Sequence, residues 1–236
     1  MDWPTVAILI VTYDRPTEIR RTILALKVHL LYPGKIAWHI ADDHTPDENY
    51  LPRIASDFQE FDITYTVTDR KGWGANVNKG MAYCLDHFSD YIFLIEDDYV
   101  TQRPIDLRQG VLLLQHAKGL GAIRYDGLHG HDLDLALREV ETPHEKVSTL
   151  IIQASSPHLN IYSNRPHLKH RRLHDHYGLY KEGAKLGETE SDFAHRVKDG
   201  YGGGPKLAAL ITGIPRAFDH IGKSRQLTEL DTGGKA

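Results

Sequence analysis

Three consecutive carboxylates, Glu96, Asp97 and Asp98, directly follow the apolar run Tyr91–Ile95. Adjacent carboxylates repel one another, so their concentration at one point lowers stability unless a cation relieves it. Divalent ions such as Mn²⁺ and Mg²⁺ bind one or two carboxylates and complete their shell with waters and substrate phosphates. The run therefore predicts a metal site, and a solvated acidic turn after a buried strand is the alternative.

Polar residues follow three further apolar runs. They are Thr12–Arg15, the pair Asp42 and Asp43, and Asp69–Gly72. In an open parallel sheet, ligands bind beyond the carboxyl ends of the strands. We therefore expect these residues to share one crevice with Glu96–Asp98. Taken alone, the aspartate pair is better explained by a helix cap or a turn, because aspartate side chains accept hydrogen bonds from nearby backbone.

Strand and helix patterns alternate through the first half of the chain. The apolar runs that predict strands are Thr5–Thr12, Lys35–Ala41, Asp62–Thr68 and Tyr91–Ile95. Apolar residues at helical spacing follow Pro16, Trp73 and Pro104. In the second half we expect strands at Val147–Gln153 and Leu207–Thr212 and a short helix at Ser191–Lys198. Such alternation predicts an α/β fold with a mostly parallel central sheet flanked by helices.

Composition narrows the class of protein. The chain has 236 residues, 41% of them hydrophobic, and a net charge of −4, which predicts one globular domain with no general attraction to nucleic acid. The single cysteine, Cys84, excludes a disulfide framework or a thiolate zinc site and fits a reducing compartment. The apolar runs fall short of the ~20 residues that span a bilayer. We therefore expect a cytoplasmic protein without an integral membrane segment, and no protein partner is inferable.

Four segments in order resemble family 2-type glycosyltransferases with the GT-A fold. They are Val6–Pro16, the pair Asp42-Asp43, Lys71–Gly80 and the Glu-Asp-Asp form of a DXD-type metal motif at Glu96–Asp98. The resemblance covers roughly residues 5–125. It implies a Rossmann-like GT-A domain in which residues 1–125 bind a nucleotide sugar. Residues 126–236 would then form the acceptor-binding half and a C-terminal tail.

The resemblance also implies which residues meet the donor. Thr12, Tyr13 and Asp43 would contact the base and ribose, while Asp98 would ligate the metal with Asp97 closer to the ribose. The full expected donor set is Thr12, Tyr13, Asp14, Arg15, Asp42, Asp43, Lys71, Gly72, Asn78, Glu96 and Asp97. Val77 stands where the family often has an arginine, so the cation for the diphosphate would come from Lys71 or Arg15.

Two later segments carry expected catalytic and metal-binding residues. Gly187–Phe193 resembles the Glu-Asp segment that supplies a catalytic base in inverting members of the family. Asp192 is the first choice and Glu190 the second, because Ser191 splits the family's adjacent pair. An acidic helix N-terminus is the alternative. His220 resembles a C-terminal histidine that folds back onto the metal, and imidazole is an acceptable Mn²⁺ ligand.

A basic stretch lies between these segments. Arg165, Lys169, Arg171 and Arg172 fall within Asn164–His176. A solvated basic helix face explains them, and so does a contact surface for the donor diphosphate or for an anionic acceptor such as DNA.

Together these observations predict a Mn²⁺- or Mg²⁺-dependent transferase. It would move a sugar from a nucleoside-diphosphate sugar, UDP-linked by preference, to a hydroxyl of a glycan or small molecule with inversion. One alternative is the same chemistry on a hydroxymethylated base in DNA. The other is a nucleotide-binding GT-A module without turnover.

Overall fold

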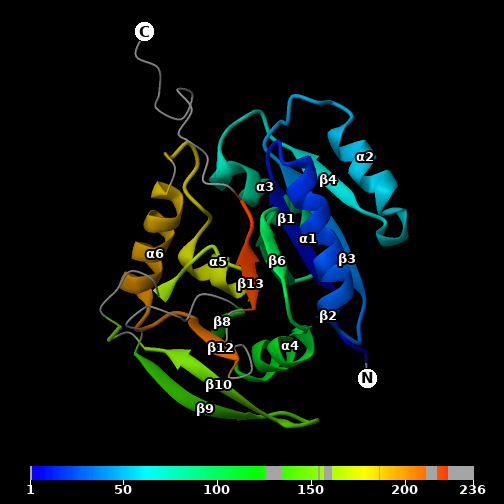
Figure 1. The fold of residues 1–236 in the computed structure, drawn as a ribbon. Helices are drawn as coiled ribbons and strands as arrows, with labels where there is room; N and C mark the ends of the chain where they lie inside the picture. The colour runs from blue at the N-terminus through cyan, green and yellow to red at the C-terminus, as the bar shows by residue number, and fades with distance from the viewer. Residues whose placement is uncertain are drawn as a thin grey trace.

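A nine-stranded sheet forms the centre of the molecule (Figure 1). The computed structural model describes residues 2–125, 134–153, 155–156, 161–185, 187–210 and 217–222. In spatial order the strands are β4 (Thr64–Val67), β3 (Ile36–Asp42), β1 (Val6–Thr12), β5 (Tyr91–Glu96), β11 (His167–His170), β8 (Leu120–Arg124), β12 (Lys206–Leu210), β10 (Lys146–Ile152) and β9 (Leu135–Glu141).

Most of these strands point the same way. The pairs β4–β3, β3–β1, β1–β5 and β8–β12 are parallel. Only β11 and β10 run against the others, because each pairs antiparallel with both of its neighbours. The predicted α/β domain with a mostly parallel central sheet is confirmed.

Helices and short strands complete the fold. They are α1 (Pro16–His29), α2 (Tyr50–Asp57), a 3₁₀ turn at Gln59–Phe61, α3 (Trp73–His87), α4 (Leu107–His116), α5 (Arg172–Tyr177) and α6 (Glu188–Gly200). Two small ladders pair β2 (Leu30–Leu31) with β7 (Ile105–Asp106), and β6 (Tyr99–Thr101) with β13 (Phe218–His220). None of the helices in the described part of the chain is long and apolar enough to cross a bilayer.

Hydrophobic cores cover both faces of the sheet. On β1, Val6, Ile8 and Ile10 belong to a cluster that includes buried residues of α1. The alternate residues Leu9 and Val11 belong to a second cluster with residues of α3. All seven residues of β1 are buried, which explains why this strand is a continuous apolar run rather than an alternating one.

The predicted strands of the first half are confirmed within a residue or two, but one helix starts later than expected. Helix α4 begins at Leu107, because the side chain of Asp106 accepts hydrogen bonds from the backbone nitrogens of Arg108 and Gln109 and acts as its N-cap. Pro104 precedes β7 instead.

The basic stretch also differs from the expected helix face. Residues His167–His170 form β11, which lies between β5 and β8 in the middle of the sheet, and only the short α5 follows it. Because a strand from the second half is inserted beside β5, both halves share one sheet and one domain. The division of roles at residue 125 stays a prediction. The predicted strand at Leu207–Thr212 is observed as β12, and its last two residues lie outside the described part.

Candidate active site

The carboxyl ends of four parallel strands form one edge of the sheet. Thr12 is paired with Asp42 across β1 and β3, and Asp42 with Val67 across β3 and β4. On the other side of β1, Val11 is paired with Glu96 of β5. The polar residues that follow these strands therefore lie side by side, as the sequence predicted. We call this the strand-end edge.

Asp97 is held in place by the end of β1. Its Oδ2 accepts a hydrogen bond from Thr12 Oγ1 at 2.7 Å, and its backbone nitrogen donates to the Val11 carbonyl at 3.0 Å. Thr12 Oγ1 also lies 2.7 Å from the hydroxyl of Tyr50. Burial raises the pKa of Asp97 to about 6, although the Thr12 hydrogen bond and the Arg15 charge oppose that rise.

Arg15 links the two aspartates of the acidic run. Its Nη1 lies 3.2 Å from Asp97 Oδ1 and also contacts Asp98 Oδ2. Burial by itself would lower the pKa of Arg15, but the two carboxylate charges raise it. The side chain of Arg15 is 24% exposed, whereas those of Asp97 and Asp98 are almost entirely covered. In this structure, therefore, the side chain of Arg15 supplies the positive charge that the acidic run needs.

The C-terminal strand β13 brings His220 to Asp98. Its pairing with β6 sets His220 opposite Tyr99, and the backbone nitrogen of Ile221 donates to the Asp98 carbonyl at 2.8 Å. His220 Nε2 then lies 3.2 Å from Asp98 Oδ2. Gly222 packs so closely that a Cβ atom there would clash with Asp98 Oδ2. Glycine is therefore required at this position.

The residues around Asp98 fit a divalent ion. Among the described residues, no group of three or more His, Cys, Asp and Glu side chains is arranged to hold a metal ion. Two protein ligands are nevertheless enough for an ion that takes its other ligands from phosphate and water. Asp98 and His220 offer a carboxylate oxygen and an imidazole nitrogen, and the buried Asp98 Oδ1 has no hydrogen-bond partner.

Glu96 and Glu190 interact electrostatically at this edge. Burial and the negative charges of Asp98, Asp97 and Glu190 raise the pKa of Glu96 to about 8, so it is neutral at pH 7. The charge of Glu190 also acts on the hydroxyl of the buried Tyr180. The Glu190 carboxylate therefore lies close enough to the end of β5 for its charge to act there.

The surroundings of Glu190 and Asp192 differ. Glu190 Oε1 accepts a hydrogen bond from the backbone nitrogen of Asn164 at 2.8 Å, so one oxygen fixes its position. Asp192 Oδ2 instead accepts hydrogen bonds from Nε and Nη2 of Arg196, at 3.0 and 2.7 Å. Arg196 is itself anchored to the carbonyl of Leu179 at 2.8 Å. This geometry favours Glu190 as the base, whereas the sequence made Asp192 the first choice.

The aspartate pair after β3 has two separate roles. Asp42 is 2% exposed and accepts hydrogen bonds from the nitrogen and the hydroxyl of Thr45, so the turn interpretation applies to it. Asp43 reaches across to the segment after β4. It accepts from Thr68 Oγ1 at 2.7 Å and from the backbone nitrogens of Lys71 and Gly72 at 3.0 Å.

Tyr13 and Arg70 meet beyond the strand ends. The guanidinium carbon of Arg70 lies 4.3 Å from the centre of the Tyr13 ring, which is a cation–π contact. Asp14, His44 and Arg70 all have positive φ angles, between 50° and 61°. Left-handed backbone is rare outside glycine and is concentrated at functional sites. Three such residues follow three neighbouring strands here.

The segment before α3 turns on Gly72. Its φ of 84° is a left-handed conformation, and it precedes the first residue of the helix. Lys71 is exposed beside it. Asn78, expected in the donor site, uses its side chain to bond the nitrogen and the carbonyl of Tyr180 and also Glu182, so its contact with a donor stays a prediction. It ties α3 to the second half of the chain.

The expected phosphate contacts are not gathered on one surface. Lys169 is 1% exposed, with its Nζ 3.3 Å from the hydroxyl of Tyr180, and burial puts its pKa well below the ordinary value. Arg172 donates to two backbone carbonyls, and Arg171 pairs with Asp90. Asp90 precedes β5, so both arginines lie at the opposite end of that strand from Glu96.

Arg165 precedes β11, at the end of that strand nearer the strand-end edge. The expectation of a common basic surface is therefore wrong for Lys169, Arg171 and Arg172. Lys169 lies on a central strand paired with Ile92 and Ala122, and its side chain packs against Tyr180 on one face of the sheet instead of reaching solvent.

Sequence reasoning missed several residues of this site. Asn164 contacts Glu190 through its backbone, which no side-chain pattern reports. Arg70 lies within Asp69–Gly72, which the sequence placed at the crevice without giving Arg70 a role, and Gly222 follows His220 by two residues. Tyr180 has no local signal, because its contacts with Asn78 and Lys169 join segments far apart in the chain.

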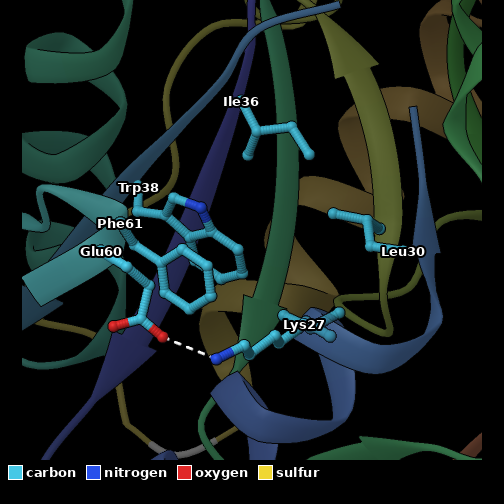
Figure 2. A pocket seen from close by; sticks show the side chains of 7 residues that line it. Lys27, Leu30, Ile36, Trp38, Glu60 and Phe61 are labelled. Atoms are coloured by element: carbon cyan, nitrogen blue, oxygen red, sulfur yellow. Dashed lines mark hydrogen bonds and ion pairs between the residues drawn. The ribbon is translucent and has the colours of Figure 1, made fainter. Parts of the chain in front are cut away.

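A cavity of about 260 Å³ lies away from the strand-end edge, between α1 and β3 (Figure 2). Trp38 and Phe61 stack in its wall with ring centres 4.7 Å apart, and an ion pair of 2.7 Å joins Lys27 to Glu60. Ile36, another lining residue, is the first residue of β3. None of the expected site residues lines this cavity, so the chemistry does not belong to it.

A family model described as glycosyl transferase family 2 matches residues 7–144, more than half of the chain. That range includes β1, β3, β4 and β5 with the polar residues that follow them. A comparison with curated proteins gave no match.

Solved structures share the fold. Residues 1–349 of S. aureus TarS, in complex with UDP-GlcNAc, match 98% of this chain with 12% identity and a TM-score of 0.66. GalNAc-T7 with UDP, GalNAc and Mn²⁺ matches 88% with 11% identity and a TM-score of 0.63. This chain covers 62% of the first structure and 42% of the second. At such identities the likeness concerns the fold alone.

Proposed function

This chain belongs to glycosyl transferase family 2, and we propose that it transfers a sugar from a UDP-sugar to a hydroxyl acceptor. The observation that carries the proposal is the strand-end edge, where Asp97, Asp98 and His220 come together and where the charge of Glu190 acts on Glu96. The two similar structures bind UDP or UDP-GlcNAc, and one contains Mn²⁺, which supports a UDP-linked donor and a divalent ion.

The donor would bind along the strand ends. Tyr13 with its Arg70 contact would face the base, and Asp43 would approach the base or ribose while it holds the segment at Lys71. Asp97, fixed by Thr12, would lie toward the ribose.

Asp98 and His220 would hold the divalent ion, whose charge would stabilise the leaving diphosphate. Glu190 would take the proton from the acceptor hydroxyl as that oxygen attacks the anomeric carbon, and the result would be inversion. Its hydrogen bond from the Asn164 nitrogen fixes one carboxylate oxygen and leaves the other for the acceptor.

The two alternatives receive less support. Transfer to a modified DNA base relied on a basic surface, and Lys169, Arg171 and Arg172 do not form one. A module without turnover relied on Val77 and on the split of Glu190 from Asp192, but Glu190, whose charge acts at the end of β5, is enough for a general base by itself. The cytoplasmic location inferred from the sequence stays a prediction.

The test is donor binding followed by turnover. Thermal melting with a panel of nucleoside diphosphates and their sugars, with and without Mn²⁺, should give a Mn²⁺-dependent shift for UDP compounds. A ligand at 100 times its Kd contributes about 2.7 kcal/mol, which is several degrees for a chain of this size.

UDP release in the presence of pooled glycan and small-molecule acceptors then measures transfer. No shift with any nucleotide would exclude the donor assignment. A shift without UDP release would leave the non-catalytic module as the better description.

A further inference from the structure

The guanidinium of Arg15 occupies the place where the acidic run needs a cation. One nitrogen, Nη1, contacts both Asp97 Oδ1 and Asp98 Oδ2. The two carboxylates are almost fully buried, and the positive charge of Arg15 relieves their mutual repulsion. In the metal-free protein, Arg15 thus neutralises the negative charge of Asp97 and Asp98, as a divalent ion would.

Arg15 and a divalent ion compete for Asp98, although its Oδ1 has no hydrogen-bond partner. Asp98 Oδ2 already contacts Arg15 Nη1, and it lies 3.2 Å from His220 Nε2, the second expected ligand. A doubly charged ion between Asp98 and His220 would lie within a few ångströms of the guanidinium, and like charges at that distance in a buried site repel strongly. Binding of the ion therefore requires the guanidinium to withdraw.

The backbone and exposure of Arg15 permit such a movement. Arg15 precedes the first turn of α1, and its carbonyl accepts the hydrogen bond of Ile19, so the main chain is held. The side chain is 24% exposed and has a long flexible stem, so the guanidinium can leave without unfolding its surroundings. A diphosphate beside the metal would offer it a new anionic partner.

We infer that Arg15 takes the place of the metal ion in the free protein, where its guanidinium binds Asp97 and Asp98. When the ion and the diphosphate bind together, the guanidinium releases Asp98. The inference rests on the proposed donor site. Its consequence is cooperativity, because UDP gives the displaced guanidinium a partner and so lowers the cost of binding the ion. By linkage, the ion must raise the affinity for UDP by the same factor.

The first test measures Mn²⁺ binding in the absence of nucleotide. Bound Mn²⁺ is quantified from the decrease of the free Mn²⁺ signal in electron paramagnetic resonance. Arg15→Gln removes the competing charge, so this variant should bind Mn²⁺ about tenfold more tightly than the wild type. Arg20→Gln is the matched control, because Arg20 pairs with the exposed Asp57 and its loss changes net charge equally. It should stay within twofold of the wild type.

Equal or weaker Mn²⁺ binding by Arg15→Gln, compared with Arg20→Gln, would overturn the inference. So would the absence of Mn²⁺ binding in every variant at millimolar ion. Arg15→Lys keeps the charge and should stay near the wild type, which separates competition by charge from a loss of packing. Melting in EDTA and in Mn²⁺ gives a second readout: Mn²⁺ should raise the Tm of Arg15→Gln more than that of the wild type.

The second test measures coupling. Saturating UDP should raise the Mn²⁺ affinity of the wild type several-fold more than that of Arg15→Gln, and an equal gain in both would contradict the inference. The proposed function fails separately. If UDP binds to neither protein but Arg15→Gln still binds Mn²⁺ more tightly than the wild type, the donor assignment is wrong, while the competition between Arg15 and the ion is supported. If UDP-sugar is turned over while Arg15→Gln leaves Mn²⁺ affinity unchanged, the reverse holds.

Discussion

Two carboxylates on the first turns of α6 show how surroundings assign a role. Glu190 and Asp192 are two positions apart, so they point in different directions from the helix. Arg196, one turn further on, pairs with Asp192, while Glu190 interacts with the groups at the end of β5. Asp192 Oδ2 already accepts two hydrogen bonds from Arg196, so this oxygen is occupied and cannot readily accept a further hydrogen bond from an acceptor hydroxyl.

Replacing each carboxylate by its amide separates the two roles. Glu190→Gln should lower kcat by about 10²-fold or more, the usual contribution of a general base. The Kd for UDP should be unchanged, and the glutamine oxygen can still accept the hydrogen bond from Asn164. Asp192→Asn should keep kcat within a few-fold. UDP release and UDP titration measure both quantities. Loss of turnover in Asp192→Asn with retention in Glu190→Gln would restore the assignment drawn from the sequence.

At the scale of elements, β3 and its edge strand β4 are joined by a buried histidine. His39 is fully buried on β3 and its ring nitrogens lie 2.9 and 3.1 Å from the hydroxyls of Thr64 and Thr66. The ring also stacks on Tyr83 of α3, at 4.3 Å. These contacts hold the four-residue strand β4 beside the strand-end edge, and they are made by the neutral ring.

This arrangement predicts acid sensitivity. Burial, and then the charge of His87, lower the pKa of His39 to about 4. The unfolded chain therefore binds a proton at higher pH than the folded one, and stability is lost as pH falls from about 6.5 to about 4. His39 contributes up to about 3 kcal/mol to that loss, from 1.36 kcal/mol per pH unit.

Urea unfolding between pH 4 and 8 checks this contribution. His39→Gln should be less stable at pH 7 but should lose less stability on acidification than the wild type. His116→Gln, at an exposed position that ends α4, is the control and should follow the wild type. Some acid dependence will remain, because burial also lowers the pKa of His170 to about 4. An unchanged slope in His39→Gln would contradict the assignment.

For the whole molecule, β11 is the element that joins the two halves. It lies between β5 and β8, and its Lys169 is enclosed by the sheet and by Tyr180, whose ring centre is 5.0 Å from Nζ. Burial lowers the pKa of Lys169 well below its ordinary value, so folding disfavours the protonated amine. An unfolded lysine is protonated at neutral pH, and burying this side chain therefore costs stability at that pH.

Lys169→Met should consequently stabilise the protein. Methionine has a similar shape without an ionisable group, and we expect a gain of about 1 kcal/mol at pH 7, or a few degrees in Tm. The difference should shrink as pH rises toward 10, because the unfolded lysine then loses its proton as well. Differential scanning calorimetry at pH 7 and 9.5 measures this, with the exposed Lys185→Met as control. A lower Tm for Lys169→Met at both pH values would show that the amine stabilises the fold.

Local sequence predicted the first half of the fold because its strands are self-contained signals. Val6–Thr12 is buried on both faces, so its apolar run is unbroken, and the polar residues after it mark where the strand leaves the core. The same reasoning failed for Asn164–His176. Four basic side chains in that stretch indicated a solvent-exposed surface, and burial of Lys169 depends on two strands from elsewhere in the chain.

By itself, the sequence determined the α/β class, the strand-end edge and the identity of the acidic run, since these follow from short-range patterns and from the rule that parallel strands end together. Tertiary structure decided which charged groups meet. It paired Arg15 with Asp97 and Asp98, Arg196 with Asp192, and left the charge of Glu190 acting at the end of β5. The physical reason is that Coulomb energy and desolvation depend on distances between side chains from different elements, which no local pattern encodes.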